Sequence, residues 1–405
     1  LPKWHGWDKL NPEYTARIKV PTGIKNVIID PTSRLADAYM LDNSQNFPVT
    51  YNYDTRLWRY PSWRDYEIKF RPDIWWNSYD GIKIGLYTSG GYMNHHHLFD
   101  ASIWINTAYL QTKDIKEPLL YDAFSYRLNY NTNLDKIFTN SRISFNTQSF
   151  SGLYISKLGL SKTTSNQNNK LSISLFSMYR PEESSKNYLL YPEYWGINKL
   201  NNRIDFSYEL NYRLNSGKGK LKFEIKNSSM GSEYNYNLFC VSSINNSTKR
   251  KLNIRSRTFI QFGSGTNWAP ESKLFLAGGN PEELMHNKFT RETGFFPSEW
   301  MGYDYTTNSF HSGGGLNLRG YAGYLAPEFD ENGIIANFGH MGTSGASINI
   351  EVDFSNYLPY ELRYSGLKYY AFADAGVITS ENLNMENLFD SFNELRADAG
   401  FGLAY

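Results

Sequence analysis

The sequence has few of the features by which many protein classes are recognised. Its 405 residues contain a single cysteine, Cys240, which excludes a disulfide framework and a cysteine-rich zinc site. The 41 basic and 40 acidic side chains leave a net charge of +1, so electrostatics gives no reason to expect a nucleic-acid partner. No apolar run approaches the about 18–20 residues that a membrane-spanning helix needs, which excludes a bundle of such helices.

Catalytic and cofactor motifs are also missing from these residues. There is no His-Glu-x-x-His motif, and the adjacent His95, His96 and His97 point in different directions without a spaced carboxylate to complete a metal site. The glycine clusters at 263–265 and 313–315 lack the Gly-Lys-Ser/Thr ending of a phosphate loop. No spacing nominates a Ser-His-Asp set. The sequence therefore names no catalytic residue, no metal ligand and no cofactor in this chain.

What the sequence does have is aromatic side chains and a regular alternation of polarity. Aromatics make up 17% of the residues, and disordered chains are poor in aromatics. From Asp65 onward, apolar and polar residues alternate with period two, which is typical of strands with one apolar face. The clearest run is 203–214. One face carries Ile204, Phe206, Tyr208, Leu210 and Tyr212, and the other carries Asp205, Glu209 and Arg213.

Long alternating strands occur in soluble sandwiches and in outer-membrane barrels. Sandwich strands have about five or six residues, whereas strands that cross a membrane need about 9–11. Several runs here have ten or more residues, their polar faces carry full charges, and Tyr and Trp gather at their ends as at membrane interfaces. The pattern therefore predicts an all-β, transmembrane antiparallel β-barrel.

Fourteen strands can be counted in the sequence. The predicted ranges are 66–76, 82–93, 100–110, 123–132, 141–150, 152–163, 169–179, 201–214, 218–229, 234–246, 250–263, 346–357, 368–378 and 395–405. The connections at 180–200, 264–345 and 379–394 follow odd-numbered strands and are long. Because barrels have long external loops and short periplasmic turns, the N-terminus is predicted to be periplasmic. The last strand runs to the end of the chain, so we expect a C-terminally truncated barrel.

Three regions follow from this count. Residues 66–405 are predicted to form the barrel, with the loop 264–345 folded into the lumen, and residues 49–65 to form a linker. Residues 1–48 are predicted to be the tail of a periplasmic β domain, a short β-sandwich remnant. Within them, 14–20 and 24–29 are predicted to be short strands, the second ending before Pro31, where the chain must be extended.

The motif GGGLNLRGY at 313–321 has the most chemical content. Arg319, between Leu318 and Gly320, is unusual in a solvated loop but reasonable if the loop enters the lumen, where carboxylates can bind a guanidinium in bidentate fashion. Alternation places three acidic side chains on the lumen face. They are Glu351, Asp353 and Asp374. A solvated arginine in a glycine-rich loop is the alternative explanation.

These residues resemble the BamA-type outer-membrane assembly barrels, a superfamily that includes the bacterial surface antigen domain. Leu318, Arg319, Gly320 and Tyr321 match the loop motif, Glu351 matches an inward glutamate, and Phe372, Asp374 and Gly376 match a Phe-x-Asp-x-Gly motif. FLAGGNPEEL at 275–284 is similar to the Gly-Gly stretch ahead of that loop. The resemblance implies sixteen strands with the arginine loop after the eleventh, where the strand count also places it. No polypeptide-transport-associated repeats precede the barrel, and the closing strand is absent, which departs from the family.

A second resemblance concerns the N-terminal part of the chain. VIIDPTSRLADAYMLDN at 27–43 is similar to the last strand of the β-sandwich in aminopeptidase N-like zinc metallopeptidases. RPDIWWNSYDGIKIG at 71–85 resembles the first hairpin of Bacteroidetes proteins that fuse such a peptidase to a surface-antigen barrel. This resemblance implies that zinc and any aminopeptidase activity belong to a domain outside these residues.

Three functions remain open at this point. The leading one is an outer-membrane barrel that anchors a periplasmic zinc-metallopeptidase-like domain. The first alternative is a protein assembly or translocation barrel, and the second is a passive porin or a soluble polysaccharide-binding β-protein. The expected location is the outer membrane of a Gram-negative bacterium. Lipid and polypeptide substrates are the expected partners, and no nucleic acid is expected.

Overall fold

The structure is a computed structural model of the chain. It describes residue 15 and residues 17–34, 37–57, 60–77, 80–93, 96–110, 123–134, 137–164, 168–188, 195–229, 231–278, 314–321, 327–329, 335–338, 341–359, 366–379 and 395–404. No helix in these residues is long and apolar enough to cross a membrane.

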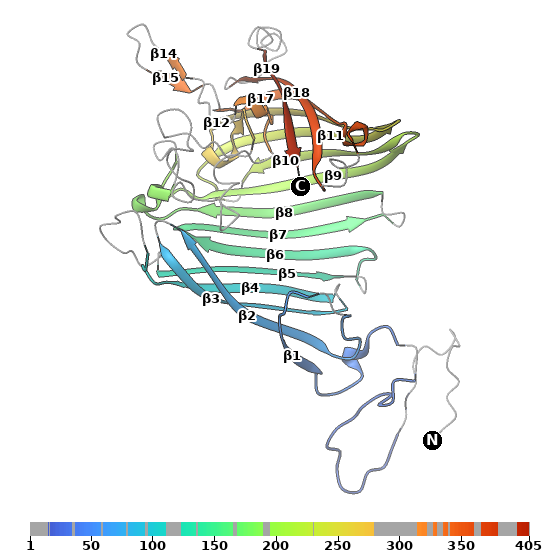
Figure 1. Ribbon diagram of the computed structural model, residues 1–405. Coiled ribbons are helices and arrows are strands. Elements are labelled where there is room, and N and C mark those ends of the chain that lie inside the picture. The colour runs from blue at the N-terminus through green and yellow to red at the C-terminus, as the bar shows by residue number, and fades with distance from the viewer. Residues whose placement is uncertain are drawn as a thin grey trace.

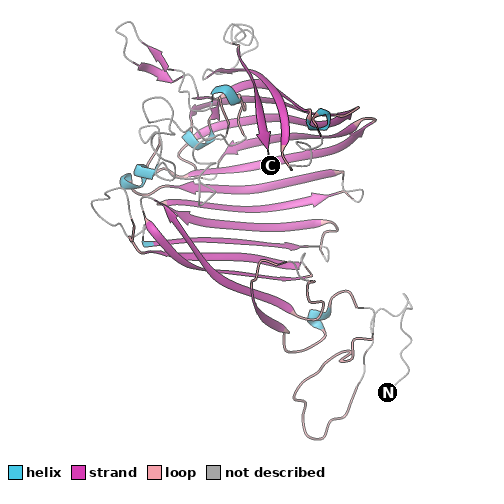
Figure 2. Cartoon of the chain, in the orientation of Figure 1, coloured by secondary structure: helices cyan, strands magenta, loops and turns pink. Residues whose placement is uncertain are grey.

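One fifteen-stranded sheet dominates the fold, and fourteen of its strands follow one another in chain order as an antiparallel meander (Figures 1 and 2). The strands are β1 (Val49–Tyr53), β2 (Tyr66–Asn77), β3 (Gly81–Tyr92), β4 (His96–Asn106), β5 (Phe124–Asn133), β6 (Ser141–Phe150), β7 (Leu153–Thr163), β8 (Asn169–Tyr179), β9 (Asn201–Leu214), β10 (Gly217–Ser228), β11 (Asn235–Lys249), β12 (Leu252–Asn267), β17 (Ser344–Asp353), β18 (Lys368–Thr379) and β19 (Arg396–Ala404). The all-β class and the fourteen-strand meander are confirmed, and no boundary differs from its predicted position by more than four residues.

The sheet is not closed. In the part of the chain that the structure describes, β19 pairs with β18 alone, and β1 pairs with β2 alone. The sheet is strongly curved at its C-terminal side, where β18 and β19 run at a steep angle to strands such as β8 and β9 (Figure 1). The described strands therefore form an open wall and not a closed barrel.

Short elements lie between β12 and β17, in the loop predicted at 264–345. β13 (Leu274–Phe275) pairs with β16 (Met341–Gly342), and β14 (Pro327–Phe329) pairs with β15 (Ile335–Phe338). Two 3₁₀ turns, η4 (Pro270–Ser272) and η7 (Arg319–Tyr321), complete the described part of this loop.

The outer face of the wall exposes its large apolar side chains. Strand register aligns Leu158, Leu175 and Ile204 on neighbouring strands, and the same face continues around the sheet. Its exposed members are Phe70, Ile74, Ile84, Leu86, Ile103, Ile105, Phe145, Leu158, Leu160, Leu171, Ile173, Leu175, Phe206, Ile225, Phe239, Phe262, Ile348, Ile350, Phe401 and Leu403. A soluble sandwich buries this face, so the wall has the inverse pattern, which is the one expected of a barrel in lipid.

The run 203–214 shows this pattern in part. Phe206 is exposed, and the other four apolar side chains of its face are half-buried, none fully. Neighbouring side chains cover one another there: Tyr212 lies over Gly219, where a Cβ would be 2.3 Å from the ring. On the opposite face, Asp205 and Glu209 form ion pairs, and Arg213 at the strand end is exposed.

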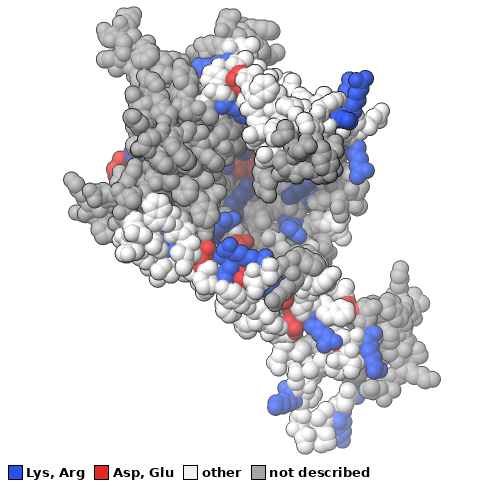
Figure 3. Space-filling view, viewed as in Figure 1, with Lys and Arg blue, Asp and Glu red and all other residues white. Residues whose placement is uncertain are grey.

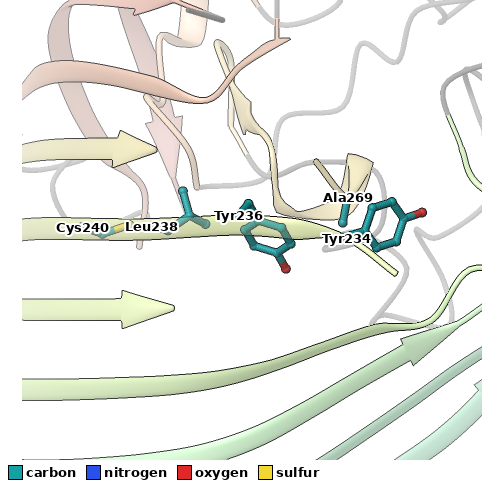
Figure 4. Packing of buried hydrophobic residues seen from close by; sticks show 5 residues of the cluster. All are labelled: Tyr234, Tyr236, Leu238, Cys240 and Ala269. Carbon is teal, nitrogen blue, oxygen red and sulfur yellow. The ribbon is translucent and has the colours of Figure 1, made fainter. Parts of the chain in front are cut away.

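One part of the core lies between the inner face of the wall and the loop that follows β12, and two further buried clusters, around Tyr92 and around Trp104, lie at β2 to β6. Figure 4 shows Tyr236, Leu238 and Cys240 in a row along β11, with Ala269 beside Tyr234, and all five are buried. The Tyr236 hydroxyl donates to Asn201 Oδ1 at 2.8 Å and lies 2.8 Å from Ser272 Oγ of η4. Burial of apolar and aromatic surface therefore holds the loop against the wall from inside.

The N-terminal region differs from the prediction. The strands predicted at 14–20 and 24–29 are absent from the described residues of 1–48, which form one 3₁₀ turn, Met40–Asp42, and one isolated bridge between Ile28 and Ser44. The sandwich remnant stays a prediction. Ile24, Ile28 and Ile29 are exposed, because a strand is stable only when a neighbouring strand covers it, and none does here. Within the predicted linker, β1 pairs in parallel with the first part of β2, from Val49 opposite Tyr66.

A charge on the outer face should destabilise the wall much more than a charge on the inner face. We expect Ile173→Arg to cost about 2–4 kcal/mol of unfolding free energy in lipid vesicles, the cost of an arginine at mid-membrane on a barrel exterior. Ser172→Arg, one residue away on the inner face, is the matched control and should cost much less. Urea titration of the folded form checks this, and equal losses for the two variants would contradict an outer face in lipid.

Candidate functional site

The arginine loop is fixed to a second loop segment by backbone hydrogen bonds and leucine side chains. The N–H of Leu316 donates to Phe275 O, and that of Leu318 donates to Leu276 O, both at 3.1 Å. These leucines form a buried cluster. Its members are Leu274, Leu276, Leu316, Leu318 and Ile378. The FLAGG and GGGLNLRGY segments that the sequence singled out are therefore neighbours, although 279–313 lie outside the described residues.

Two glycines of the motif permit close approaches that no other residue would. Gly315 has φ +49°, and a Cβ there would lie 2.4 Å from the Phe275 carbonyl oxygen. A Cβ on Gly320 would lie 2.6 Å from the Cβ of Asp398. The motif is glycine-rich because its backbone lies directly against the neighbouring segment and the wall.

Arg319 is bound to two carboxylates of the inner wall. Its Nε and Nη2 donate to the two oxygens of Asp374 at 2.8 and 2.9 Å, and its backbone N–H donates to the same carboxylate at 3.1 Å. Its Nη1 donates to Glu351 Oε2 at 2.9 Å. The guanidinium therefore makes a bidentate pair with one carboxylate and a single ion pair with the other. We call this group the arginine clasp.

The Phe-x-Asp-x-Gly motif of β18 forms the receiving surface of the arginine clasp. The ring of Phe372 lies 4.0 Å from the guanidinium carbon of Arg319, a cation–π contact. Asp374 follows two residues later on the same inner face. A Cβ on Gly376 would lie 2.8 Å from the Ala346 carbonyl oxygen, so this glycine permits the close approach of β17. Each of the three motif positions thus has a separate physical task.

Burial makes this pairing strong. The Asp374 side chain is fully buried, whereas the side chains of Arg319 and Glu351 are 17% and 30% exposed. Burial opposes the charge of Arg319, but hydrogen bonds to Asp374 and Glu351 outweigh it and raise the pKa of the guanidinium above its ordinary value. The guanidinium is charged at every pH at which the protein folds.

The structure brings most of the predicted residues together. Leu318 is buried, Arg319, Gly320 and Tyr321 form η7, and Glu351, Asp374 and Gly376 surround this turn. Asp353 lies apart from Arg319. Its carboxylate accepts from the hydroxyl and backbone N–H of Ser355 and from Asn253, and it stabilises the turn after β17.

Two residues that hold the loop, and a third that lies beside its turn, were missed by sequence reasoning. Arg257 of β12 donates to the Gly315 carbonyl at 2.8 Å and to Asn349 Oδ1 at 3.0 Å, and the Asn349 amide donates to Asn317 O at 2.9 Å. Asp398 of β19 lies opposite Asp374 in the strand register. The signal was available, because alternation places Asn349 on the face of Glu351.

No group of three or more His, Cys, Asp or Glu side chains among the described residues is placed to hold a metal ion. His95 lies outside those residues. His96 packs against Tyr39 at 5.6 Å between ring centroids, and Nδ1 of His97 is 2.9 Å from the Tyr130 hydroxyl. These two histidines belong to the aromatic packing at the end of the sheet where β1 lies.

Comparison with known proteins gives distant structural likenesses. No protein-family model and no curated protein matches the sequence. The fold is similar to the crystal structure of BamA from Haemophilus ducreyi lacking POTRA domains 1–3, with 12% identity, a TM-score of 0.42, and coverage of 83% of this chain and 63% of that one. It is also similar to CdiB from Acinetobacter baumannii, with 11% identity, a TM-score of 0.34, and coverage of 80% and 47%. The chain thus covers less than two thirds of either structure.

Removal of the guanidinium should release the loop from the wall. We expect Arg319→Ala to cost about 3–5 kcal/mol, because it leaves the buried Asp374 without a counter-charge. Arg319→Lys should restore part of this, since lysine lacks the planar fork. Arg213→Ala, which removes an exposed arginine at the end of β9 and so away from the clasp, is the control. Urea midpoints and limited proteolysis of the loop provide the measurement, and an Arg319→Ala protein as resistant as the control would refute the arginine clasp.

The two carboxylates should contribute unequally. Asp374→Asn should cost about 3 kcal/mol, because Asp374 is buried and accepts three of the hydrogen bonds from Arg319. Glu351→Gln should cost about 1 kcal/mol, because Glu351 accepts one hydrogen bond and is partly exposed. The loss from Glu351→Gln should also shrink in high salt. Urea titrations of both variants at low and high ionic strength test the order, and a larger loss for Glu351→Gln would reverse it.

Proposed function

We propose that this chain forms the membrane-spanning wall of an outer-membrane barrel that assembles or translocates polypeptides. The observation that carries the proposal is the arginine clasp. The residues that resemble the BamA-type loop and strand motifs are the same residues that contact one another, although they come from separate segments. A chance resemblance in sequence gives no reason for Arg319, Phe372, Asp374 and Gly376 to meet at one point.

The faces of the wall support the membrane part of the proposal. Exposed Ile173, Phe206 and Ile348 belong to an apolar surface that extends over the strands, and the charged side chains of those strands lie inside. A soluble polysaccharide-binding protein would leave this surface in water, which is costly. We assign the chain to the outer membrane of a Gram-negative bacterium.

A free strand edge supports the proposal that the barrel acts on polypeptides. β1 covers β2 only from Tyr66 to Phe70, so in the described residues 71–77 have no neighbour on that side. Unpaired backbone groups of an edge can accept a further strand. A loop held against the inner wall by Arg319 and Arg257 also occupies lumen space that a passive pore needs.

The position of the N-terminal segment supports a proposed orientation of the wall in the outer membrane. Tyr39 and Met40 contact Tyr92, whose hydroxyl donates to Trp63 O at 2.7 Å, so this segment lies at the end of the sheet where β3 turns into β4. The turns at this end are mostly short, and we assign it to the periplasm. Anchoring of a zinc-metallopeptidase domain stays a prediction from residues 27–43 and 71–85, because no contact among the described residues favours it.

The test is an assembly assay with the full chain refolded into liposomes. A urea-unfolded eight-stranded barrel serves as the substrate, and its folding is followed by its heat-modifiable mobility in gels. We expect about tenfold faster folding than in liposomes without the chain, which corresponds to about 1.4 kcal/mol of barrier. Arg319→Ala should remove most of the acceleration, and Arg213→Ala should keep it.

Two controls separate the alternatives. The chain's own heat-modifiable mobility shows that it is folded before each assay. Swelling of the same liposomes in sugar solutions reports passive permeability. A folded chain that gives no acceleration but permits rapid sugar entry would replace the proposed function with that of a passive pore.

A further inference from the structure

A charged cavity lies inside the wall, apart from the arginine clasp. It has a volume of about 310 Å³ and is bounded by β8 to β12 and by residues of the loop that follows β12. Five basic residues line it: Arg203, Lys222, Lys226, Arg257 and Lys273. Among the described residues, the acidic ones of its lining are Glu224 and Glu271, so positive charge is in excess there. Figure 3 shows blue and red side chains gathered in the hollow of the molecule.

The two arginines are fixed by the protein itself. Arg203 lies 3.9 Å from the ring centroid of Phe176, pairs with Asp205 at 2.8 Å and donates to Ser272 Oγ at 3.2 Å. Arg257 lies 4.8 Å from the Phe259 ring and donates to the Gly315 carbonyl. Both guanidinium groups therefore hold the loop and shape the cavity, and their charge still acts across it.

The three lysines of the cavity lining have fewer partners than the two arginines. Lys222 pairs with Glu224 at 2.9 Å. Lys226 and Lys273 are half-buried, and neither forms an ion pair with a described residue. Burial lowers the pKa of the Lys273 ammonium, which reflects a loss of hydration that no carboxylate replaces. Lys226 lies opposite Asp205 and two residues from Glu224, but Arg203 and Lys222 already bind those two carboxylates. An anion between Lys226 and Lys273 would offset the cost of their partial burial.

We propose that this cavity is a binding site for a small phosphate-bearing solute, held by Lys226 and Lys273. A phosphate monoester carries about −1.5 to −2 charges at pH 7, which complements the excess of basic side chains. The volume is at the lower end of the range for small-molecule sites, about 300–1,000 Å³. Ammonium groups bind phosphate as point charges and require no planar partner.

The position of the cavity selects a water-soluble ligand. It lies on the inner face, opposite the apolar surface that includes Phe206 and Phe239, so its ligand enters from the aqueous lumen. A lipid headgroup would bring acyl chains into a lining that contains seven charged residues. The inference does not depend on the assembly function, since it rests on the charges and the loop alone.

The experiment is calorimetric titration of the full chain, refolded in neutral detergent in a phosphate-free buffer, with inorganic phosphate and with pyrophosphate as probes. We expect saturable binding at one site, tighter for pyrophosphate. Lys226→Gln and Lys273→Gln should each weaken binding about tenfold, the effect of one charge-assisted hydrogen bond. Lys226→Arg keeps the charge and should retain most of the affinity.

Lys218→Gln is the matched control. Lys218 lies on the same strand and the same face as Lys226, is exposed, and does not line the cavity, so this variant removes an equal charge elsewhere. It should bind as the unchanged chain does. No saturable heat with the folded chain, or equal losses for Lys218→Gln and Lys226→Gln, would overturn the proposal. The liposome assay is scored separately, so the two proposals can fail independently.

Discussion

The alternation of side chains across one hydrogen-bonded wall is the constraint on which the rest of the structure depends. Successive residues of a strand point to opposite faces, and register aligns like residues on neighbouring strands, as Leu158, Leu175 and Ile204 show. Because the outer face is apolar, charges of the wall such as Arg203 and Asp205 must find partners inside. The buried ion pairs are therefore a consequence of the outer surface.

Two guanidinium groups hold the loop after β12 to the wall, one from the loop and one from the wall. Arg319 belongs to the loop and binds carboxylates of the wall, whereas Arg257 belongs to the wall and binds the loop carbonyl of Gly315. Leu316 and Leu318 lie between them and are fully buried. Apolar packing is non-directional, so by itself it buries the leucines without fixing where along the wall they lie. The directional hydrogen bonds of Arg319 and Arg257, on either side of the leucines, fix that position.

The strands and the partners of Arg319 could be predicted because both depend on local alternation. In the run 203–214, the alternation of apolar and polar residues shows which side chains face outward and which inward. The same rule places Glu351 and Asp374 on the inner face. Residues 24–29 and β1 show where local reasoning fails: the first segment has strand-like residues but no neighbour, and the second pairs with the free edge of β2. The cavity could not be predicted either, because Lys226 and Lys273 lie on segments that only the fold brings together.

The net charge of +1 conceals an uneven distribution inside the wall. Around η7, the strands β17, β18 and β19 contribute Glu351, Asp374 and Asp398, and Arg319 supplies the opposite charge. Around η4, basic side chains outnumber acidic ones, and two lysines have no ion pair among the described residues. Charges in a partly desolvated interior interact more strongly than charges in water. Arg319 binds Glu351 and Asp374, whereas both buried oxygens of Asp398 have no hydrogen-bond partner among the described residues. The loop thus lies between an acidic region that it neutralises in part and a basic region that it leaves for a ligand, which is why the arginine clasp and the cavity have different tasks.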